Sequence, residues 1–298
     1  MPSLLSPADR APCNNQAVPD VVVFGASGQL GTGLIPVLRA AGLDVAAAAR
    51  SVDLQDARAL AAAVAQAKPR WVVNAAAMTD VDGAHADPAR AFAINALGAG
   101  EIARAANAIG ARTVHVSTEA VFDGEQQVPY TEADPCRPVS VYGASKRAGE
   151  SLVSIYDPQA YVLRTSWLYG QQQGANFPTR LLANLARGSS EVPVVTDVVG
   201  NPTPVAVLAD AIRAVIESPC DPGLYHVCCT GAASKFDWAI AIAEHAGLDP
   251  RRIIPVTADA FPTPAARPKH VDLSVRQFAA TGLLELPSWR AAWERYAF

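Results

Sequence analysis

The stretch VVVFGASGQLG, which runs from Val21 to Gly31, decides the fold of this chain. Its first four residues form a continuous apolar strand, and a helix is expected over 30–41. Three glycines between them let the backbone turn sharply and approach a pyrophosphate at the helix N-terminus. The stretch therefore predicts a dinucleotide-binding loop, with a cluster of helix-packing glycines as the alternative. Its candidate cofactor-binding residues are Gly25, Ser27, Gly28, Gln29 and Leu30.

Short apolar strands alternate with longer helical stretches over the first 165 residues. Strands are expected over 20–24, 44–49, 70–74, 111–117 and 160–165, and helices over 30–41, 56–67, 88–109 and 139–156. Alternation at this spacing predicts an α/β fold, a Rossmann-type doubly wound parallel sheet. The strands are near-solid runs of Val, Ile, Leu and Ala, as expected when helices cover both faces of a sheet.

The chain divides into three parts by composition and texture. Residues 1–19 are rich in Pro, Ser, Ala and Asn and are interpreted as a flexible N-terminal extension. Residues 20–170 form the predicted dinucleotide-binding domain. After a polar run at 171–174 the elements become shorter, so 171–298 is predicted to be a smaller C-terminal substrate-binding lobe, parts of which return to the first domain. Helices over 204–217 and 234–246, strands over 224–227 and 253–256, and a loop over 261–268 are expected there.

Composition excludes several classes of protein. The net charge of −4 and the lack of a Lys/Arg-rich block argue against nucleic acid as a partner. No apolar run approaches the roughly 18 residues that a membrane span needs. The five cysteines form no Cys-x-x-Cys pair and have no histidine at zinc-ligand spacing, so no metal site is predicted. These features are typical of a reduced, cytoplasmic protein.

A tyrosine and a lysine stand one helical turn apart in the run VYGASK, which starts at residue 141. On a helix Tyr142 and Lys146 share one face, so the ammonium can stabilise the phenolate of a group whose ordinary pKa is about 10. Thr118 ends the fourth predicted strand, and ligands of parallel α/β sheets bind beyond the carboxyl ends of the strands. These three residues are the catalytic candidates. Without them as a set, a surface lysine lying over a tyrosine ring is the simpler interpretation.

The end of the second predicted strand bears on the choice of cofactor. NAD sites often place an acid there, whereas NADP sites place an arginine nearby. This chain has Arg50 and Ser51 at that point and no acid until Asp53. Arg50 and Ser51 are therefore candidates to hold a 2′-phosphate, which favours NADPH, with NADH possible.

The order of Thr118, Tyr142 and Lys146 is that of short-chain dehydrogenases/reductases. Further motifs make the resemblance closer: NAAAMTDVD at 74–82, VFDG at 121–124, YGASKRAGE at 142–150 and RTSWLYG at 164–170. Together with the glycine loop, they resemble the dTDP-4-dehydrorhamnose reductase family of extended short-chain dehydrogenases. The resemblance runs from about residue 20 to about residue 201 and is fainter beyond.

The resemblance implies a role for each candidate. Tyr142 is expected to protonate the developing alkoxide, Lys146 to bind the nicotinamide ribose and lower the pKa of the tyrosine, and Thr118 to hydrogen-bond the carbonyl oxygen. Substrate contacts are expected from Thr118, Glu119 and Trp167, the last packing on the sugar. Residues expected along the dinucleotide or near its adenine are Asp53, Leu54, Ala75, Ala76 and Ala77.

The implied substrate is a small-molecule ketone, a nucleotide-linked deoxysugar or a related natural-product ketone. Departures from the family pattern at Glu119, Ala120, Val198 and His270 fall in substrate-facing stretches and suggest a shifted substrate, with drift in an ordinary family member as the alternative. A sugar-nucleotide epimerase or dehydratase, and a non-catalytic nucleotide-binding regulatory subunit, are the other functions left open. A homodimer is also left open, with Glu101 and Arg104 of the helix over 88–109 as candidates for its face.

Overall fold

A six-stranded parallel sheet forms the centre of the computed structural model, which describes residues 18–170, 176–187 and 191–297. Its strand order is β10-β5-β4-β3-β1-β2, and the order reverses between β1 and β3, where ligands of such sheets bind. The strands are β1 (Val21–Phe24), β2 (Val45–Ala47), β3 (Trp71–Asn74), β4 (Arg112–Thr118), β5 (Tyr161–Thr165) and β10 (Gly223–His226). The predicted doubly wound α/β fold is confirmed.

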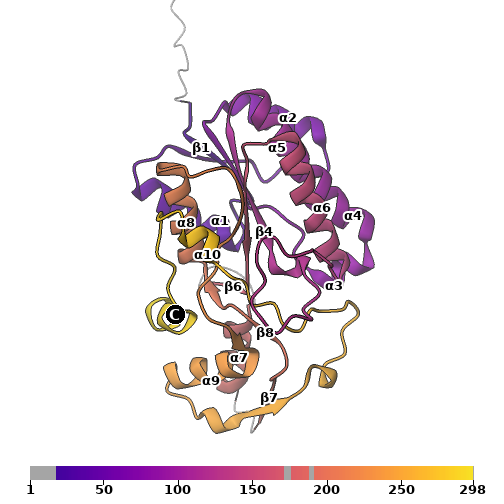
Figure 1. Cartoon of the computed structure of the whole chain (residues 1–298), viewed down its shortest axis with the longest axis vertical. Coiled ribbons are helices and arrows are strands. Elements are labelled where there is room, and N and C mark those ends of the chain that lie inside the picture. Colours follow the sequence, from indigo (N-terminus) through magenta and orange to yellow (C-terminus); the bar gives the residue numbers. More distant parts are fainter. Residues whose placement is uncertain (1–17, 171–175, 188–190, 298) are drawn as a thin grey trace, which may run out of the picture.

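Helices cover both faces of this sheet (Figure 1). One face carries α1 (Gln29–Ala40) and α8 (Val205–Glu217), and the other carries α2 (Ala57–Ala67), α5 (Ala99–Ala108) and α6 (Val141–Tyr156). Alternate residues of β1 feed the two apolar cores: Val21 and Val23 pack on the first face, Val22 and Phe24 on the second. All four side chains are buried, which explains why the strand is apolar throughout.

The helix expected over 88–109 is interrupted, so its prediction as one regular helix was wrong in the middle. Asp87 caps α4 (Pro88–Phe92) by accepting from the backbone N–H of Arg90, as expected for an N-cap. A π-helical segment, Ala93–Gly98, then leads into α5. Its buried Asn95 binds the backbone N–H and C=O of Met78 and the hydroxyl of Ser145. These contacts come from distant segments, which explains why local sequence did not reveal the π turn.

The second half of the chain supplies a smaller lobe below the sheet in Figure 1. Its helices are α7 (Phe177–Ala186) and α9 (Lys235–His245), and β7 (Val192–Val195) pairs there with β12 (Ile253–Val256). The strand expected over 253–256 is confirmed, and Ser234 caps α9 in a reciprocal capping box. Short strands join the lobe to the sheet: β6 (Leu168–Tyr169), β8 (Val199–Gly200), β9 (Thr203–Pro204) and β11 (Ala233–Ser234).

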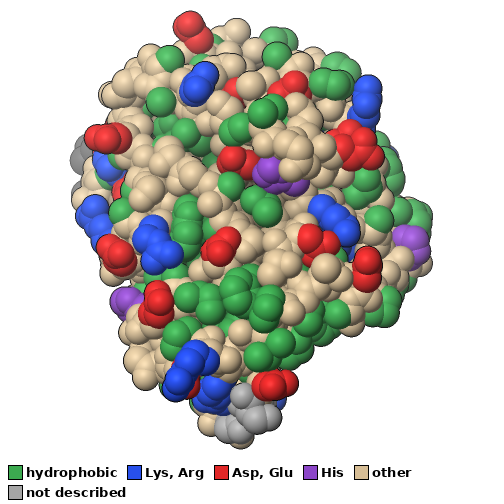
Figure 2. All heavy atoms as spheres, turned by 60° about the horizontal axis from the view of Figure 1, so that its bottom comes forward, with side chains coloured by type: hydrophobic (Ala, Val, Ile, Leu, Met, Phe, Trp, Pro, Cys, Tyr) green, Lys and Arg blue, Asp and Glu red, His purple; other side chains and the backbone are tan. Residues whose placement is uncertain are grey.

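The remaining elements are short. The helices are α3 (Val81–Ala86), α10 (Arg276–Ala279) and α11 (Trp289–Tyr296), and the 3-10 turns are Glu119–Val121, Pro250–Arg252 and Ala258–Ala260. No helix of the described residues is long and apolar enough to cross a membrane. Figure 2 shows the lower end of the molecule, where acidic and basic side chains are interspersed.

Two elements that follow residue 170, one strand and one helix, complete the large sheet and the helices that cover it. β10 pairs with β5 in parallel, and α8 packs on α1 so closely that a Cβ added to Gly33 would lie 2.3 Å from Val205 Cγ1. The sheet is therefore built from both sides of the polar run. That run and residues 1–17 of the predicted extension lie outside the described residues.

Candidate active site

Two glycines of the loop after β1 are fixed by close backbone approaches. Gly25 has φ +77°, and a Cβ on it would lie 2.7 Å from the carbonyl of Ala75. A Cβ on Gly31 would lie 2.3 Å from the carbonyl oxygen of Gly25. A side chain at Gly25 would push the loop away from the residues after β3, and one at Gly31 would clash with the loop itself, so the loop keeps its shape only with glycine at both positions.

A cavity of about 400 Å³ opens on one side of this loop. Five of the predicted cofactor-binding residues line it: Gly25, Ser27, Arg50, Leu54 and Ala76. Val52 also lines it and was not predicted. Ser51 and Asp53 are not among its lining residues, and the exposed Asp53 carboxylate accepts from the backbone N–H of Gln55. Their contact with a cofactor stays a prediction.

A second cavity, of about 390 Å³, lies on the other side of the loop at the carboxyl ends of the strands. It brings together the other predicted residues: Gly28, Gln29, Leu30, Ala75, Ala77, Thr118, Glu119, Tyr142, Lys146 and Trp167. Sequence reasoning missed Thr79, Val116, Ser117, Thr165 and Leu168, which also line it. Thr79, Thr165 and Leu168 belong to the motifs quoted above, so their place in those motifs could have identified them.

Lys146 is buried at the base of the second cavity. Its Nζ donates to the carbonyl oxygen of Val116 at 2.7 Å and lies 3.5 Å from Nε2 of His115. Burial lowers the pKa of the ammonium to about 8, although the charge of Glu150 acts in the opposite direction. The lysine is therefore close to its titration point near neutral pH.

The phenol of Tyr142 is kept protonated by its surroundings. Burial raises its pKa, the charge of Glu119 raises it further, and a hydrogen bond with Thr118 lowers it in part. Lys146 is not one of the groups that shift this pKa, so the lowering of the tyrosine pKa expected from the sequence is not found. A protonated phenol at the cavity wall is a proton donor rather than a base.

Thr118 ends β4 beside the phenol. Its Oγ1 donates to Oε2 of Glu119 at 2.7 Å and accepts from the backbone N–H of Ala120. Burial raises the pKa of Glu119, while the bond from Thr118 and the charge of Lys235 lower it. The strand end therefore gathers a hydroxyl and a carboxyl at one wall of the second cavity.

A buried ion pair supports the second cavity from behind. Ser117 donates to Oε1 of Glu150 at 2.6 Å, and the guanidinium of Arg164 donates to both carboxylate oxygens at 2.8 Å. Burial raises the pKa of Glu150, but the bonds and charge of Arg164 outweigh it, so the pKa is lowered overall. The pair fixes α6, which carries the tyrosine and the lysine, to β4 and β5.

Trp167 lies where the second cavity meets a third. Its backbone has a φ of +40°, and Nζ of Lys235, at the start of α9, lies 3.3 Å from the centre of its ring. Trp167 also stacks on Trp238 at 6.0 Å. Lys235 also lines the neighbouring cavity, and burial lowers its pKa to about 7. The contact of lysine and indole thus marks the passage between the two spaces.

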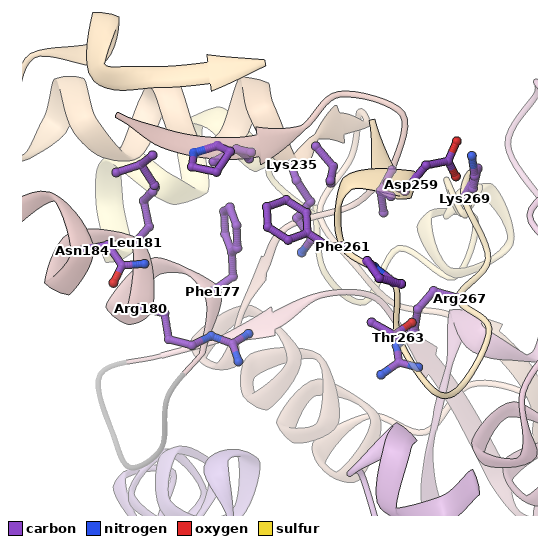
Figure 3. Close-up of a pocket in the computed structure, with 17 residues that line it drawn as sticks. Phe177, Arg180, Leu181, Asn184, Lys235, Asp259, Phe261, Thr263, Arg267 and Lys269 are labelled. Carbon is purple, nitrogen blue, oxygen red and sulfur yellow. The ribbon is translucent and has the colours of Figure 1, made fainter. Parts of the chain in front are cut away.

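The third cavity, of about 840 Å³, combines basic and aromatic side chains. Figure 3 shows Arg180 reaching into it from α7, with Phe177 and Phe261 above and the loop with Arg267 and Lys269 at the far side. Arg267 pairs with Asp82 at 2.9 Å, and Lys269 pairs with Asp197 at 2.8 Å. Val198 lines this cavity as well. Cations beside aromatic rings suit an anionic ligand that carries a planar ring.

Known proteins are similar to this chain in sequence and fold. The sequence profile of the RmlD substrate binding domain family matches residues 19–297. The chain belongs to this family. It is 40% identical to a dTDP-4-dehydrorhamnose reductase of Mycobacterium tuberculosis over 91% of this chain and 90% of that protein. It is 38% identical to the spore coat polysaccharide biosynthesis protein SpsK of Bacillus subtilis, over 93% of this chain and 96% of SpsK.

Solved structures of this RmlD family have the same fold. The dTDP-4-dehydrorhamnose reductase of Bacillus anthracis, solved in complex with NADP, superposes with a TM-score of 0.88 at 34% identity, covering 94% of this chain and 99% of that one. The resemblance drawn from the motifs is thereby confirmed, and it extends through the C-terminal lobe. Within the described residues no group of three or more His, Cys, Asp or Glu side chains is placed to hold a metal ion.

Proposed function

We propose that this protein is an NADPH-dependent ketoreductase of the short-chain dehydrogenase type, which reduces the keto group of a dTDP-linked deoxysugar such as dTDP-4-dehydrorhamnose. The observation that carries the proposal is that Thr118, Tyr142 and Lys146 line one cavity with the glycine loop. Relatives that are named dTDP-4-dehydrorhamnose reductases, one of them in complex with NADP, support the activity and the cofactor.

The cavities on either side of the glycine loop fit the two halves of a dinucleotide. Gly25 lines the first cavity and Gly28 the second. Gly25 lies close to Ala75 and has no side chain, so the loop backbone is open where the dinucleotide would pass from one cavity to the other. Arg50 in the first cavity would hold the 2′-phosphate, which favours NADPH over NADH. When bound, NADPH supplies the hydride; the chain supplies orientation and the proton.

Tyr142 is the proposed proton donor to the new alcohol, since its raised pKa keeps the phenol protonated until an alkoxide develops beside it. Lys146 would hold the nicotinamide ribose from the base of the cavity. Thr118 would orient the carbonyl oxygen, and for that its hydroxyl must leave the bond that it now makes to Glu119. These interactions act on charge that develops in the transition state.

The third cavity is the proposed site of the nucleotide carrier. Arg180, Lys235 and Arg267 would face the diphosphate, and the rings of Phe177 and Phe261 would contact the base. Trp167, at the junction with the second cavity, would then lie beside the sugar. The substitutions at Glu119, Ala120 and Val198 leave the sugar itself open among 4-keto deoxysugars.

Purified protein incubated with NADPH and dTDP-4-dehydrorhamnose tests the proposal. We expect stoichiometric loss of absorbance at 340 nm and formation of a dTDP-linked alcohol. An epimerase or dehydratase would regenerate its cofactor without net consumption, and a regulatory subunit would bind NADPH without turnover; either result would overturn the proposal. A homodimer and a cytoplasmic location stay predictions. Glu101 and Arg104, the candidates for a dimer face, form an ion pair with each other on α5.

A further inference from the structure

Lys146 belongs to a chain of buried polar contacts. This chain starts at the end of β3, beside the glycine loop. The backbone N–H of Ala76, a residue of the first cavity, donates to Oδ1 of Asn74 at 3.1 Å. Nδ2 of Asn74 lies 3.2 Å from Nδ1 of His115, whose Nε2 lies 3.5 Å from Nζ of Lys146. Asn74, His115 and Lys146 are at most 2% exposed. Water therefore cannot replace any of the hydrogen-bond partners in this chain of contacts.

The first contact fixes the tautomer of the imidazole. Because Oδ1 of Asn74 accepts from Ala76, its amide nitrogen must face His115 as a donor. Nδ1 of His115 must then accept, and the single proton of a neutral imidazole sits on Nε2. Burial and the charge of Lys146 lower the pKa of His115 well below its usual value, so the ring is neutral.

The imidazole therefore turns a donor, and not an acceptor, toward the lysine. An ammonium has donors only, so it finds no acceptor on His115, and within the described residues its hydrogen-bond acceptor is the carbonyl of Val116. The charged neighbour on α6, Glu150, is already bound by Ser117 and Arg164. Tyr142, which shares the cavity, is protonated and carries no charge. The surroundings thus destabilise the ammonium, and with a pKa of about 8 roughly half of the lysine is neutral at pH 8 until an acceptor enters the cavity.

We propose that Asn74 and His115 are positioning residues that hold Lys146 ready to take up a proton when NADPH binds. The inference rests on the proposed function, in which Lys146 contacts the nicotinamide ribose. Ribose oxygens and cofactor phosphates favour the ammonium, and the donor on Nε2 directs its remaining protons toward the cavity. Cofactor binding and protonation of the lysine are then linked, so that near pH 8 the lysine becomes fully charged only in the loaded site.

Proton linkage of NADPH binding tests this directly. Calorimetric titrations of the whole protein at pH 8, in buffers of different ionisation enthalpy, give the protons taken up per NADPH bound. With a lysine pKa of about 8 in the free protein, we expect roughly half a proton per site. The cofactor phosphates do not interfere, since the second phosphate pKa is about 6.

Three variants separate the tautomer from mere packing. In Asn74→Asp the carboxylate accepts from Nδ1, so Nε2 becomes an acceptor for the ammonium and the uptake should fall to near zero. In His115→Gln the amide oxygen can face Lys146, so the uptake should fall likewise without any new charge. His115→Phe keeps a ring but offers no acceptor, and it should retain the uptake.

The outcomes distinguish the proposed function from the proposed uptake of a proton by Lys146. Wild-type protein that fails to bind NADPH would overturn the proposed function and this inference together. Binding without proton uptake would overturn the inference alone, as would equal uptake by His115→Gln and His115→Phe. If Asn74→Asp does not fold, the two His115 variants still give the answer, because only the glutamine can present an acceptor to Lys146.

Discussion

Tyr142 lies in surroundings that suit a donor of protons. Burial and the charge of Glu119 raise the pKa of its phenol, so it holds its proton at every pH at which the protein is expected to work. Lys146, one turn further along α6, is balanced near its titration point instead. The two residues that share one helix face are thus held in different roles by different neighbours.

Replacing Tyr142 by Phe removes the proposed proton donor and keeps the ring. We expect kcat for ketone reduction to fall by about 10²–10⁴-fold, the usual contribution of a general acid. NADPH affinity, measured by quenching of protein fluorescence, should change little. A Tyr142→Phe protein with wild-type kcat would contradict the proposed mechanism.

Arg50 is the basic residue in the lining of the first cavity. If it binds the 2′-phosphate, Arg50→Ala should lower kcat/KM for NADPH by about ten- to a hundredfold, as expected for the loss of a charge-assisted hydrogen bond. NADH lacks that phosphate, so its kcat/KM should hardly change. Steady-state rates with both cofactors give the comparison, and an equal loss with NADH would show that Arg50 does not choose between them.

At the scale of elements, the buried pair of Glu150 and Arg164 joins α6 to β5. Removing one partner of such a pair leaves the other charge buried, which costs about 3–5 kcal/mol. We expect Glu150→Gln to lower the free energy of unfolding by that amount in urea titrations. Arg147→Gln is the matched control: Arg147 reaches the same carboxylate at 3.2 Å from the surface, and its loss should cost at most about 1 kcal/mol.

The same pair gives a pH dependence. Because the pKa of Glu150 in the folded protein is below its ordinary value of 4.5, its stabilising contribution is present above about pH 4.5 and is lost as the pH falls below it. The difference in Tm between wild type and Glu150→Gln should therefore be constant above pH 5 and shrink below pH 4.5. A difference that grew on acidification would contradict the assigned direction.

Elements whose signals are local could be predicted from the sequence. Gly31, which lies against Gly25 and Ala26, and the tyrosine and lysine that share one face of α6 depend on neighbours within one or two turns. The π-helical segment depends on Asn95 binding Met78 and Ser145, and the role of His115 depends on Asn74 and Lys146. Contacts between segments far apart in the sequence leave no periodic signal, so local reasoning missed them.

On the scale of the whole molecule, the chain offers three adjoining cavities for two ligands. NADP⁺ should occupy the two beside the glycine loop, and dTDP the third, so each should raise Tm on its own. A ligand at about 100 times its Kd adds ~2.7 kcal/mol of stability, which corresponds to a shift of several degrees.

Arg180→Ala should abolish the shift in Tm caused by dTDP and leave that caused by NADP⁺ intact, because Arg180 lines the third cavity alone. Arg213→Ala removes the same charge from α8, where Arg213 pairs with Glu217 outside the cavities described above, and serves as the control. Scanning calorimetry with each ligand gives the four comparisons. Loss of both shifts in Arg180→Ala would mean that the arginine supports the fold and not a carrier site.

The way in which β10 and α8 complete the large sheet has a consequence for synthesis. A nascent chain on the ribosome carries an open hydrogen-bonding edge at β5 and an uncovered apolar side of α1 until residues 205–226 have emerged. The nucleotide-binding half therefore cannot finish folding when its own five leading strands have been made. We expect its closure late in translation, with chaperones shielding the growing chain until then.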